Sequence, residues 1–162
     1  MWYRSPELLF GAQQYGHGVD VWAAGCLLAE LLPRQQTHSS SHQHRAALFP
    51  GSSELNQLQK IFELIGTPSE SIWKEAVNFP NFQRFTYLPP DHSWVRDMFA
   101  ASIDAAPDTD KVLISMLSLD PNHRPSAQAL LDSPYLSELG PRPCAEQALA
   151  KQVLAFVGKH KE

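Results

Sequence analysis

Hydrophobic residues recur along this chain with the spacing of short helices rather than that of strands. Residues 19–32 are apolar on nearly every side, which predicts a helix at the centre of the domain that ends at Pro33. Residues 55–65 carry apolar side chains on one face and are followed by Gly66 and Pro68. This order of residues is typical of an amphipathic helix and its C-terminus.

The remaining apolar segments are shorter. Pro6 suits the first turn of a short helix, and further helices are predicted over 108–119, 126–131 and 149–157. No segment shows the strict alternation of apolar and polar residues that indicates a strand. We therefore predict an all-α fold.

Two stretches interrupt the helical pattern. Residues 34–47 are polar and rich in Ser, His and Gln, which predicts a disordered insertion. Residues 69–107 are interrupted by prolines and contain many aromatic side chains, so we expect a loop-rich segment whose rings pack on the body of the domain. The domain itself is predicted over 1–136, and 137–162 form a C-terminal tail that includes the last predicted helix.

Composition and charge exclude several classes of protein. The chain has 13 basic and 17 acidic residues and a formal net charge of −4, which argues against broad binding to nucleic acid or to an anionic membrane. The longest apolar run, 21–32, is too short to span a bilayer and contains Glu30. Two cysteines, Cys26 and Cys144, make a disulfide framework improbable and favour a reducing compartment.

Three motifs occur in the order expected of one large enzyme family. Residues 2–7 (WYRSPE) resemble the end of the activation segment of a protein kinase. Residues 20–26 (DVWAAGC) resemble the opening of its central helix, and 120–125 (DPNHRP) resemble the turn before its last core helix. With LFPG at 48–51 and LIGTP at 64–68, the resemblance narrows to cyclin-dependent kinases and covers residues 1–136.

The chain is thus similar to the helical C-terminal lobe of a cyclin-dependent serine/threonine kinase, without the N-lobe and the catalytic loop. It most resembles the cyclin-dependent-kinase-activating kinase, and the cell-cycle-related kinase branch is nearly as close. The resemblance implies ATP-dependent phosphorylation of Ser or Thr, favoured before proline, with ATP and Mg as cofactors of the parent kinase. It also implies a cyclin and protein substrates as partners and a nuclear location, otherwise a cytoplasmic one.

Residues that bind ATP or transfer phosphate are missing from these 162 residues. The chain contains no G-x-G-x-x-G, H-R-D or D-F-G motif, so we predict no catalytic residue, no cofactor and no activity for the chain by itself. These motifs precede the activation segment in kinases. We therefore expect the DNA upstream of the Met1 codon to encode the rest of a kinase.

The resemblance also assigns roles to individual residues. It implies that Glu7 and Arg124 form a buried ion pair. Trp2, Tyr3 and Arg4 belong to the activation segment beside the substrate pocket, although we expect Arg4 to be an exposed charge near a frayed terminus here. Asp20 either caps the central helix or, as in the family, accepts hydrogen bonds from the catalytic loop.

Two alternatives stay open. The chain could be a non-catalytic interaction module, made by alternative initiation or splicing. A zinc-binding adaptor is conceivable through His38, His42 and His44, because the His-x3-His spacing occurs in zinc sites. The Ser- and Gln-rich flanks and the lack of a nearby Cys or carboxylate favour a solvated, metal-free loop instead. Cys26 lies in an apolar run, so we expect it to be unreactive.

Overall fold

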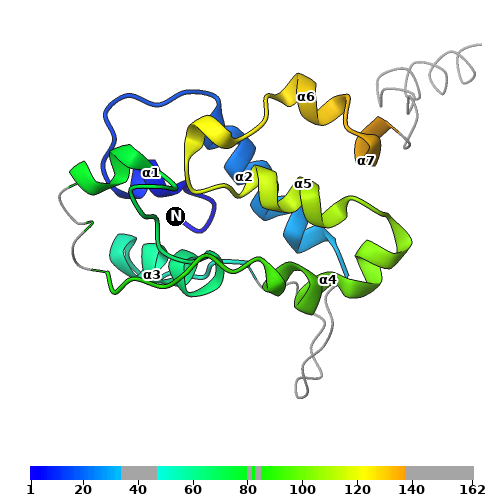
Figure 1. Cartoon of the computed structure of the whole chain (residues 1–162), viewed down its shortest axis with the longest axis horizontal. Coiled ribbons are helices and arrows are strands. Elements are labelled where there is room, and N and C mark those ends of the chain that lie inside the picture. The colour runs from blue at the N-terminus through cyan, green and yellow to red at the C-terminus, as the bar shows by residue number, and fades with distance from the viewer. Residues whose placement is uncertain (34–46, 80–81, 83–84, 138–162) are drawn as a thin grey trace, which may run out of the picture.

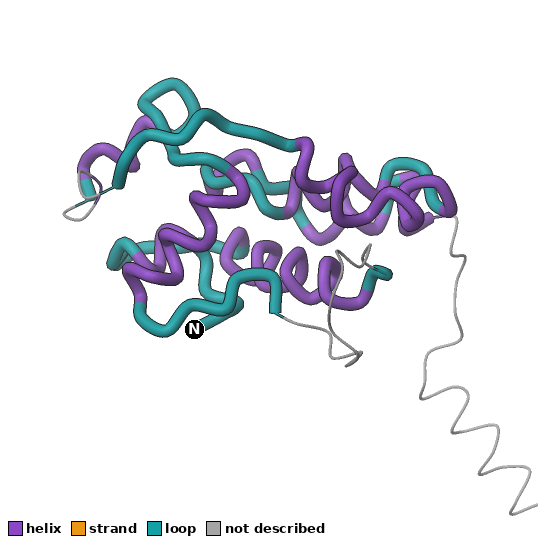
Figure 2. The backbone as a smooth tube through the Cα atoms, turned by 90° about the horizontal axis from the view of Figure 1, so that it is seen from below, coloured by secondary structure: helices purple, strands orange, loops and turns teal. Residues whose placement is uncertain are grey.

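The computed structural model describes residues 1–33, 47–79, 82 and 85–137. Within these residues it consists of helices and loops and contains no strand, which confirms the all-α class (Figures 1 and 2). The elements in chain order are α1 (Pro6–Leu9), α2 (Gly18–Leu31), α3 (Glu54–Ile65), the 3₁₀ helix η1 (Lys74–Asn78), α4 (Ser93–Ala105), α5 (Thr109–Met116), the 3₁₀ helix η3 (Pro121–His123), α6 (Ala127–Leu131) and α7 (Pro134–Ser137).

Helix α2 packs against α5 through a position without a side chain. A Cβ atom on Gly25 would lie 3.0 Å from both Leu117 Cδ2 and Met116 Cβ, so glycine allows the two helices to approach closely. On the buried side of α2, Trp22 and Cys26 are at most 1% exposed. The opposite side is not covered within the described residues, where Leu27 is 49% and Leu31 61% exposed.

Helix α3 is amphipathic, as its sequence pattern predicts. Its N-terminus is capped by Ser53, whose side chain accepts a hydrogen bond from the Asn56 amide, and it ends at Gly66, which has φ +97°. The buried face of α3 carries Leu58, Ile61, Phe62 and Ile65. After Gly66 the chain is held beside residues 86–88, because the Thr67 amide donates to the Leu88 carbonyl at 2.9 Å.

Aromatic rings join the N-terminal part of the chain to the irregular segment before α4. The ring of Phe10, directly after α1, lies with its centroid 5.1–6.4 Å from five other rings. These are the rings of Phe62, Trp73, Phe79, Phe82 and Phe85. The structure therefore confirms that aromatic side chains of the 69–107 segment pack on the body of the domain.

The same segment differs from the prediction in one respect. Residues 93–105 form α4, a helix of 13 residues with a kink at Phe99, where the prediction had loops. Its buried residues Val95, Phe99 and Ile103 recur every four positions, and Trp94 is buried beside Val95. The preceding prolines and the scattered aromatics obscured this helical period.

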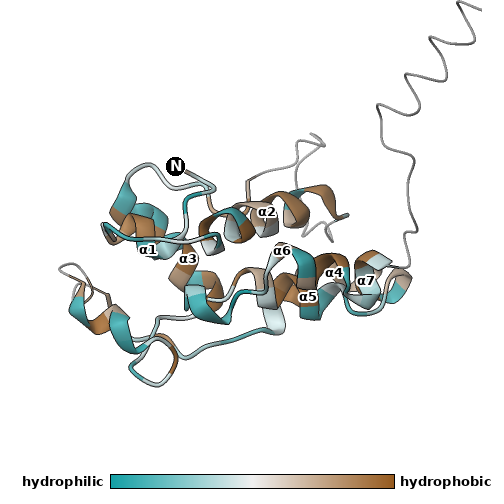
Figure 3. Ribbon diagram, turned by 90° about the horizontal axis from the view of Figure 1, so that it is seen from above, coloured by the Kyte–Doolittle hydropathy of each residue, from teal (hydrophilic) through white to brown (hydrophobic). Residues whose placement is uncertain are grey.

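The C-terminal elements α5, η3 and α6 are connected by capped turns. The Asp120 side chain accepts a hydrogen bond from the Asn122 amide at 2.8 Å, and Ser126 caps α6 by accepting from the Ala129 amide at 3.1 Å. A small second core, apart from the main one, contains Val21, Val112, Met116 and Leu130, with Leu28, Tyr135 and Leu136 packed against it. Hydrophobic residues accordingly line α2 and α5 in Figure 3.

Several predicted features lie outside the described residues. They are the insertion (all but Ala47 of 34–47), with its three histidines, and the tail after Ser137, with Cys144 and the helix over 149–157. In the described part of the chain, no helix combines the length and apolar character that a membrane span requires.

Candidate functional site

Glu7 and Arg124 form a bidentate ion pair in the interior. Arg124 Nη1 donates to Glu7 Oε1 at 2.7 Å, and Arg124 Nη2 donates to Glu7 Oε2 at 2.8 Å. Glu7 is 4% and Arg124 5% exposed, although 117 positions separate them in the sequence. A guanidinium and a carboxylate are matched in geometry for this arrangement, which is among the strongest hydrogen-bonded pairs in proteins.

Arg124 also holds three backbone carbonyls. Its Nε donates to Ser118 O at 2.8 Å, Nη1 to Gly18 O at 2.9 Å and Nη2 to Leu119 O at 3.2 Å. The guanidinium carbon lies 5.0 Å from the centroid of the Trp22 ring. Arg124 therefore joins α1, the start of α2 and the residues that follow α5. These contacts fix the position of the segment that precedes α1.

Residues 2–4 each contact a different part of the fold. Trp2 Nε1 donates to Gly51 O at 2.9 Å, and the Tyr3 hydroxyl donates to Glu30 Oε2 at 3.1 Å. That hydrogen bond raises the pKa of Tyr3 above its ordinary value, since it favours the neutral phenol. Trp2 thus contacts the loop that precedes α3, Tyr3 contacts α2, and Arg4 contacts the first turn of α3.

Arg4 is exposed, as expected, but it is not unpaired. Its Nη1 lies 2.8 Å from Oε1 of Glu54 at the start of α3. Because the two side chains are 46% and 56% exposed, water screens the attraction and the pair adds little stability. Its effect is on geometry, since it turns the Arg4 side chain toward α3.

Gln57 is a site residue that the sequence interpretation missed. Its side chain is fully buried and accepts a hydrogen bond from the Gly51 amide at 2.9 Å, while its Nε2 donates to Trp2 O at 3.1 Å. A Cβ atom on Gly51 would lie only 2.4 Å from Gln57 Oε1, so this contact requires glycine. The sequence did contain a sign of this role, because Gln57 is a polar residue directly before Leu58 on the buried face of α3.

Asp20 does not act as the helix cap. Helix α2 begins at Gly18 with His17 as its N-cap, which places Asp20 in the first turn, where it is exposed. Within the described residues its carboxylate makes no hydrogen bond, so any effect on α2 is limited to its charge near the positive end of the helix dipole. The helix starts one residue before the predicted range 19–32, at Gly18, where a Cβ atom would lie 3.2 Å from Pro121 O.

Cys26 and the acidic and histidine side chains are further candidates for reactive or metal-binding groups. Burial raises the pKa of the Cys26 thiol to about 12, and the Glu30 carboxylate acts in the same direction. A thiol with so high a pKa is a poor nucleophile at neutral pH. Among the described residues there is no group of three or more His, Cys, Asp or Glu side chains arranged to hold a metal ion.

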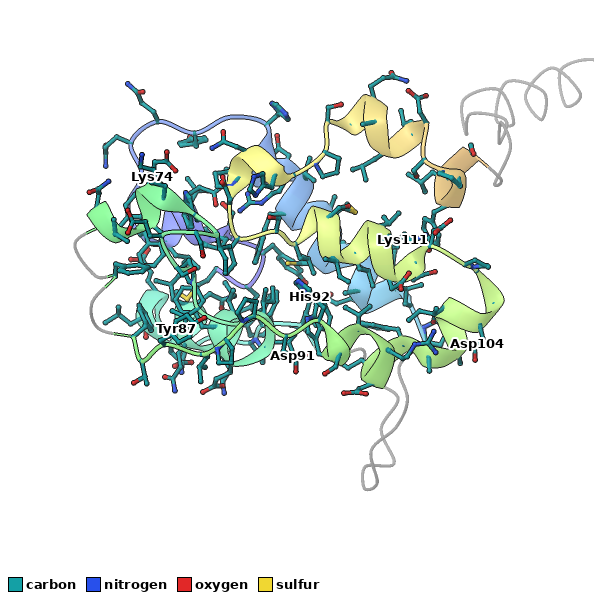
Figure 4. The ribbon with its side chains drawn as sticks, viewed as in Figure 1. Lys74, Tyr87, Asp91, His92, Asp104 and Lys111 are labelled. Carbon is teal, nitrogen blue, oxygen red and sulfur yellow. The ribbon has the colours of Figure 1, made fainter. Side chains whose placement is uncertain are left out.

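A groove of about 570 Å³ lies along α3, and Ser53, the N-cap of this helix, lines one end of it. Its apolar walls come from Leu55, Phe62, Phe85 and Leu88, with polar residues Ser53, Asn56, Gln59, Glu63 and Thr86 around them. Tyr87, labelled in Figure 4, projects from the adjoining segment and is 60% exposed. The hydrogen bond from Lys60 lowers the pKa of Glu63, so this carboxylate is charged at neutral pH.

This arrangement displays side chains on the surface from a firmly held segment. A short surface segment with two aromatic side chains and an arginine is fixed by a buried ion pair and a buried glutamine, and an amphipathic groove lies nearby. In the described part of the chain, the side-chain hydroxyls that bond to a carboxylate, an amide or another hydroxyl are the Tyr3 hydroxyl, which donates to Glu30, and serine hydroxyls on the surface.

Comparison with known proteins gives consistent matches. The family model described as the protein kinase domain matches residues 1–136. The chain is 35% identical over 151 residues to the serine/threonine-protein kinase crk1 of Schizosaccharomyces pombe, and these residues cover 93% of this chain and 41% of that protein.

Two plant relatives are similar at the same level. The chain is 40% identical over 136 residues to cyclin-dependent kinase D-1 of Oryza sativa subsp. indica, which covers 83% of this chain and 28% of that protein. It is 39% identical over 149 residues to cyclin-dependent kinase C-1 of Arabidopsis thaliana, with 92% and 26% covered. The chain therefore spans between 26% and 41% of the length of these relatives.

Proposed function

This chain belongs to the protein kinase domain family, and from that premise we propose that it is the helical, substrate-side part of a cyclin-dependent serine/threonine kinase. The observation that carries the proposal is the buried pair of Glu7 and Arg124. The resemblance assigns these two positions to the ion pair that ties the activation segment to the helical lobe. In this chain the pair fixes the segment that displays Trp2, Tyr3 and Arg4.

Within a complete kinase, residues 2–4 would form one wall of the substrate pocket. Gln57 supports this role, because it holds the Trp2 carbonyl and the Gly51 amide in one buried contact. The finer assignments are proposals on the resemblance alone. They are phosphorylation before proline, a cyclin partner, a place nearest the cyclin-dependent-kinase-activating branch, and a nuclear location.

The described residues do not fit ATP or magnesium. They contain no acidic cluster for a metal ion, and the chain has no Gly-rich phosphate-binding loop. No step of phosphoryl transfer is therefore assigned to these residues, and we propose that the chain by itself is inactive. Calorimetry with Mg-ATP at millimolar concentration tests this, and saturable binding would contradict it.

A chimeric kinase tests the family function directly. Residues 1–136 would replace the matching segment of the Schizosaccharomyces pombe relative, and phosphorylation of a Ser-Pro peptide would be measured. We expect the chimera to be active, and a Ser-Ala peptide to be a poorer substrate. Arg124→Met should reduce activity strongly because the activation segment loses its anchor, whereas the exposed Gln128→Ala should not.

A chimera that folds but phosphorylates neither peptide would count against the proposal. It would favour a second candidate, a non-catalytic interaction module. The groove beside α3 supports that candidate, since it combines apolar walls with a charged carboxylate, as ligand-binding pockets do.

A further inference from the structure

Trp2, Gly51 and Gln57 form a closed set of three hydrogen bonds near the start of the chain. The Gly51 amide donates to Gln57 Oε1 at 2.9 Å, Gln57 Nε2 donates to Trp2 O at 3.1 Å, and Trp2 Nε1 donates to Gly51 O at 2.9 Å. Each residue thus donates to one of the other two and accepts from the other. We call these three residues the hydrogen-bonded triangle, and it holds both the backbone and the indole of Trp2.

Gln57 is the fixed member of the triangle. It is 0% exposed, as are Leu58 and Ile61 on the same helix, so α3 carries it beside the main core. Gly51 lies directly against it, because a Cβ atom on Gly51 would be 2.6 Å from Gln57 Cα. Trp2, by contrast, is 46% exposed. The buried amide therefore determines where the exposed residue lies.

A buried side-chain amide needs a reason, because methionine fills a similar volume without polar atoms that must be paired. Pairing the Gly51 amide is an insufficient reason, since this amide also donates to the Phe49 carbonyl at 3.0 Å. What the Gln57 side chain adds is the donor from Nε2 to Trp2 O. The buried glutamine is thus explained by the placement of Trp2.

Helix α3 holds a second residue of the same segment. Glu54 lies three positions before Gln57, so the two are on one side of the helix. Glu54 Oε1 is 2.8 Å from Arg4 Nη1. Figure 1 accordingly shows the N-terminus beside α3. Because Trp2 is held by the buried amide and Arg4 by the exposed carboxylate, α3 sets the position of both ends of residues 2–4.

We propose that Gln57 is a positioning residue for the peptide substrate, an inference that rests on the proposed kinase function. Gln57 lies behind residues 2–4, in the interior, so it touches no substrate and acts through Trp2. Without its donor Trp2 is no longer fixed to α3, and a segment that must first be ordered costs affinity for the peptide. The chemical step is left as it is, because the motifs that bind ATP and transfer phosphate are not among these residues.

The chimeric kinase that contains residues 1–136 tests the proposal with a Ser-Pro peptide. Gln57→Met removes the polar atoms of the side chain and keeps its length. We expect the KM for the peptide to rise about three- to tenfold, as for the loss of one ordinary hydrogen bond. The kcat and the KM for ATP should change less than about twofold. Gln128→Met is the matched control, because it makes the same change at an exposed position on α6, and it should leave all three constants unchanged.

The split between KM and kcat separates positioning from folding. A variant that is only less stable has fewer active molecules, which lowers the apparent kcat and leaves KM as it was. Such a result in Gln57→Met, or no change in any constant, would overturn this inference alone, because the unsubstituted chimera is then still active. If the unsubstituted chimera folds but phosphorylates no peptide, the proposed function fails and this inference fails with it.

A second variant approaches the triangle from the surface. Trp2→Phe keeps an aromatic ring and removes the N–H that donates to Gly51, at a residue that is 46% exposed. If Trp2 and Gln57 act through one triangle, the rise in peptide KM in the double variant should be smaller than the product of the two single rises. Two factors that simply multiply would mean that the residues act independently, against the proposal.

NMR of the full chain gives a readout that does not depend on activity. The Trp2 indole N–H, assigned by its absence in Trp2→Phe, should exchange with water more slowly than that of free tryptophan. In Gln57→Met it should exchange about threefold or more faster than in the unsubstituted chain, whereas Gln128→Met should match the unsubstituted chain. Equal exchange in Gln57→Met would show that Gln57 does not hold Trp2 and would overturn the proposal.

Discussion

Arg124 uses its whole hydrogen-bonding capacity. A guanidinium has five N–H donors, and the five acceptors are the two oxygens of Glu7 and the carbonyls of Gly18, Ser118 and Leu119. Burial of a charge is costly unless it is paired and hydrogen-bonded, and here both conditions are met. The residue is thus a junction between three segments and not only half of an ion pair.

This geometry predicts strong coupling between Glu7 and Arg124. Either single change, Glu7→Gln or Arg124→Met, should cost about 3–5 kcal/mol in unfolding free energy, because it leaves a buried charge without its partner. Arg124→Met should be the more damaging, since three carbonyls also lose their donor. The double variant should be less destabilised than the two singles summed, by about 0.5–3 kcal/mol, in urea denaturation.

The exposed pair of Arg4 and Glu54 is the matched control. The same cycle with Arg4→Met and Glu54→Gln should give a coupling below about 1 kcal/mol, because water screens this pair. Equal coupling energies in the two cycles would contradict the assignment of the buried pair as the anchor.

Cys26 predicts a pH dependence of stability at alkaline pH. Its pKa is about 12 in the folded chain against 9.0 for an ordinary thiol. Between these values the unfolded state binds fewer protons than the folded state, so the free energy of unfolding falls as pH rises. The contribution of one such group is at most about 1.4 kcal/mol per pH unit.

The measurement is a series of urea denaturations from pH 8 to pH 11, with Cys144→Ser in both chains so that only Cys26 differs. Replacement of Cys26 by Ala should make the loss of stability with pH less steep. Parallel slopes in the two chains would mean that the thiol ionises equally in both states.

At the scale of elements, the C-terminal end of α3 determines how closely the helix approaches the chain at residues 89–90. Gly66 ends α3 with φ +97° and ψ 168°, a conformation that is almost restricted to glycine. A Cβ atom there would lie 2.6 Å from Pro90 Cα and 2.7 Å from Pro89 O. Two separate costs, backbone strain and a clash with backbone atoms, therefore apply to any substitution.

Gly11 provides a comparison for this helix end. It also has positive φ, +87°, but nothing lies within 4 Å of a Cβ atom there. Gly11→Ala should cost about 1–2 kcal/mol from strain alone. Gly66→Ala should cost clearly more in thermal or urea denaturation, and a smaller effect than that of Gly11→Ala would refute the close approach of residues 89–90 to α3.

For the whole molecule, the aromatic cluster around Phe10 joins the N-terminal residues to the middle of the chain. It connects α1, α3 and the segment from Trp73 to Phe85, which are far apart in sequence. This long-range packing holds the described residues between α3 and α4, where η1 is the regular element, on the body of the domain. The position of residues 2–4, which lie just before α1, thus depends on contacts between segments that are distant in the chain.

Phe10→Ala should therefore act on the whole fold. Loss of this buried ring should cost about 3–5 kcal/mol in unfolding free energy. Tyr15→Ala, at a position 64% exposed, should change stability by less than about 0.5 kcal/mol. Tryptophan fluorescence and far-UV circular dichroism should report the same loss in Phe10→Ala. Unchanged stability in this variant would mean that the cluster is not part of the core.

The sequence alone was sufficient for the helices with a clear period and clear ends. Residues 55–65 were predicted where α3 spans Glu54–Ile65, because Ser53, Gly66 and Pro68 mark both ends locally. The motifs also placed Glu7 and Arg124 in one ion pair, since the family resemblance carries long-range information that composition and periodicity lack.

Only the tertiary structure decided the rest. Gln57 is buried because its amide meets Trp2 and Gly51, and the solvent-exposed face of α2 depends on which elements pack against it. Helix α4 forms where prolines and scattered aromatics hid the period, because its apolar side meets the main core. Local patterns record backbone preferences and caps, whereas burial and pairing arise from residues that are distant in the chain.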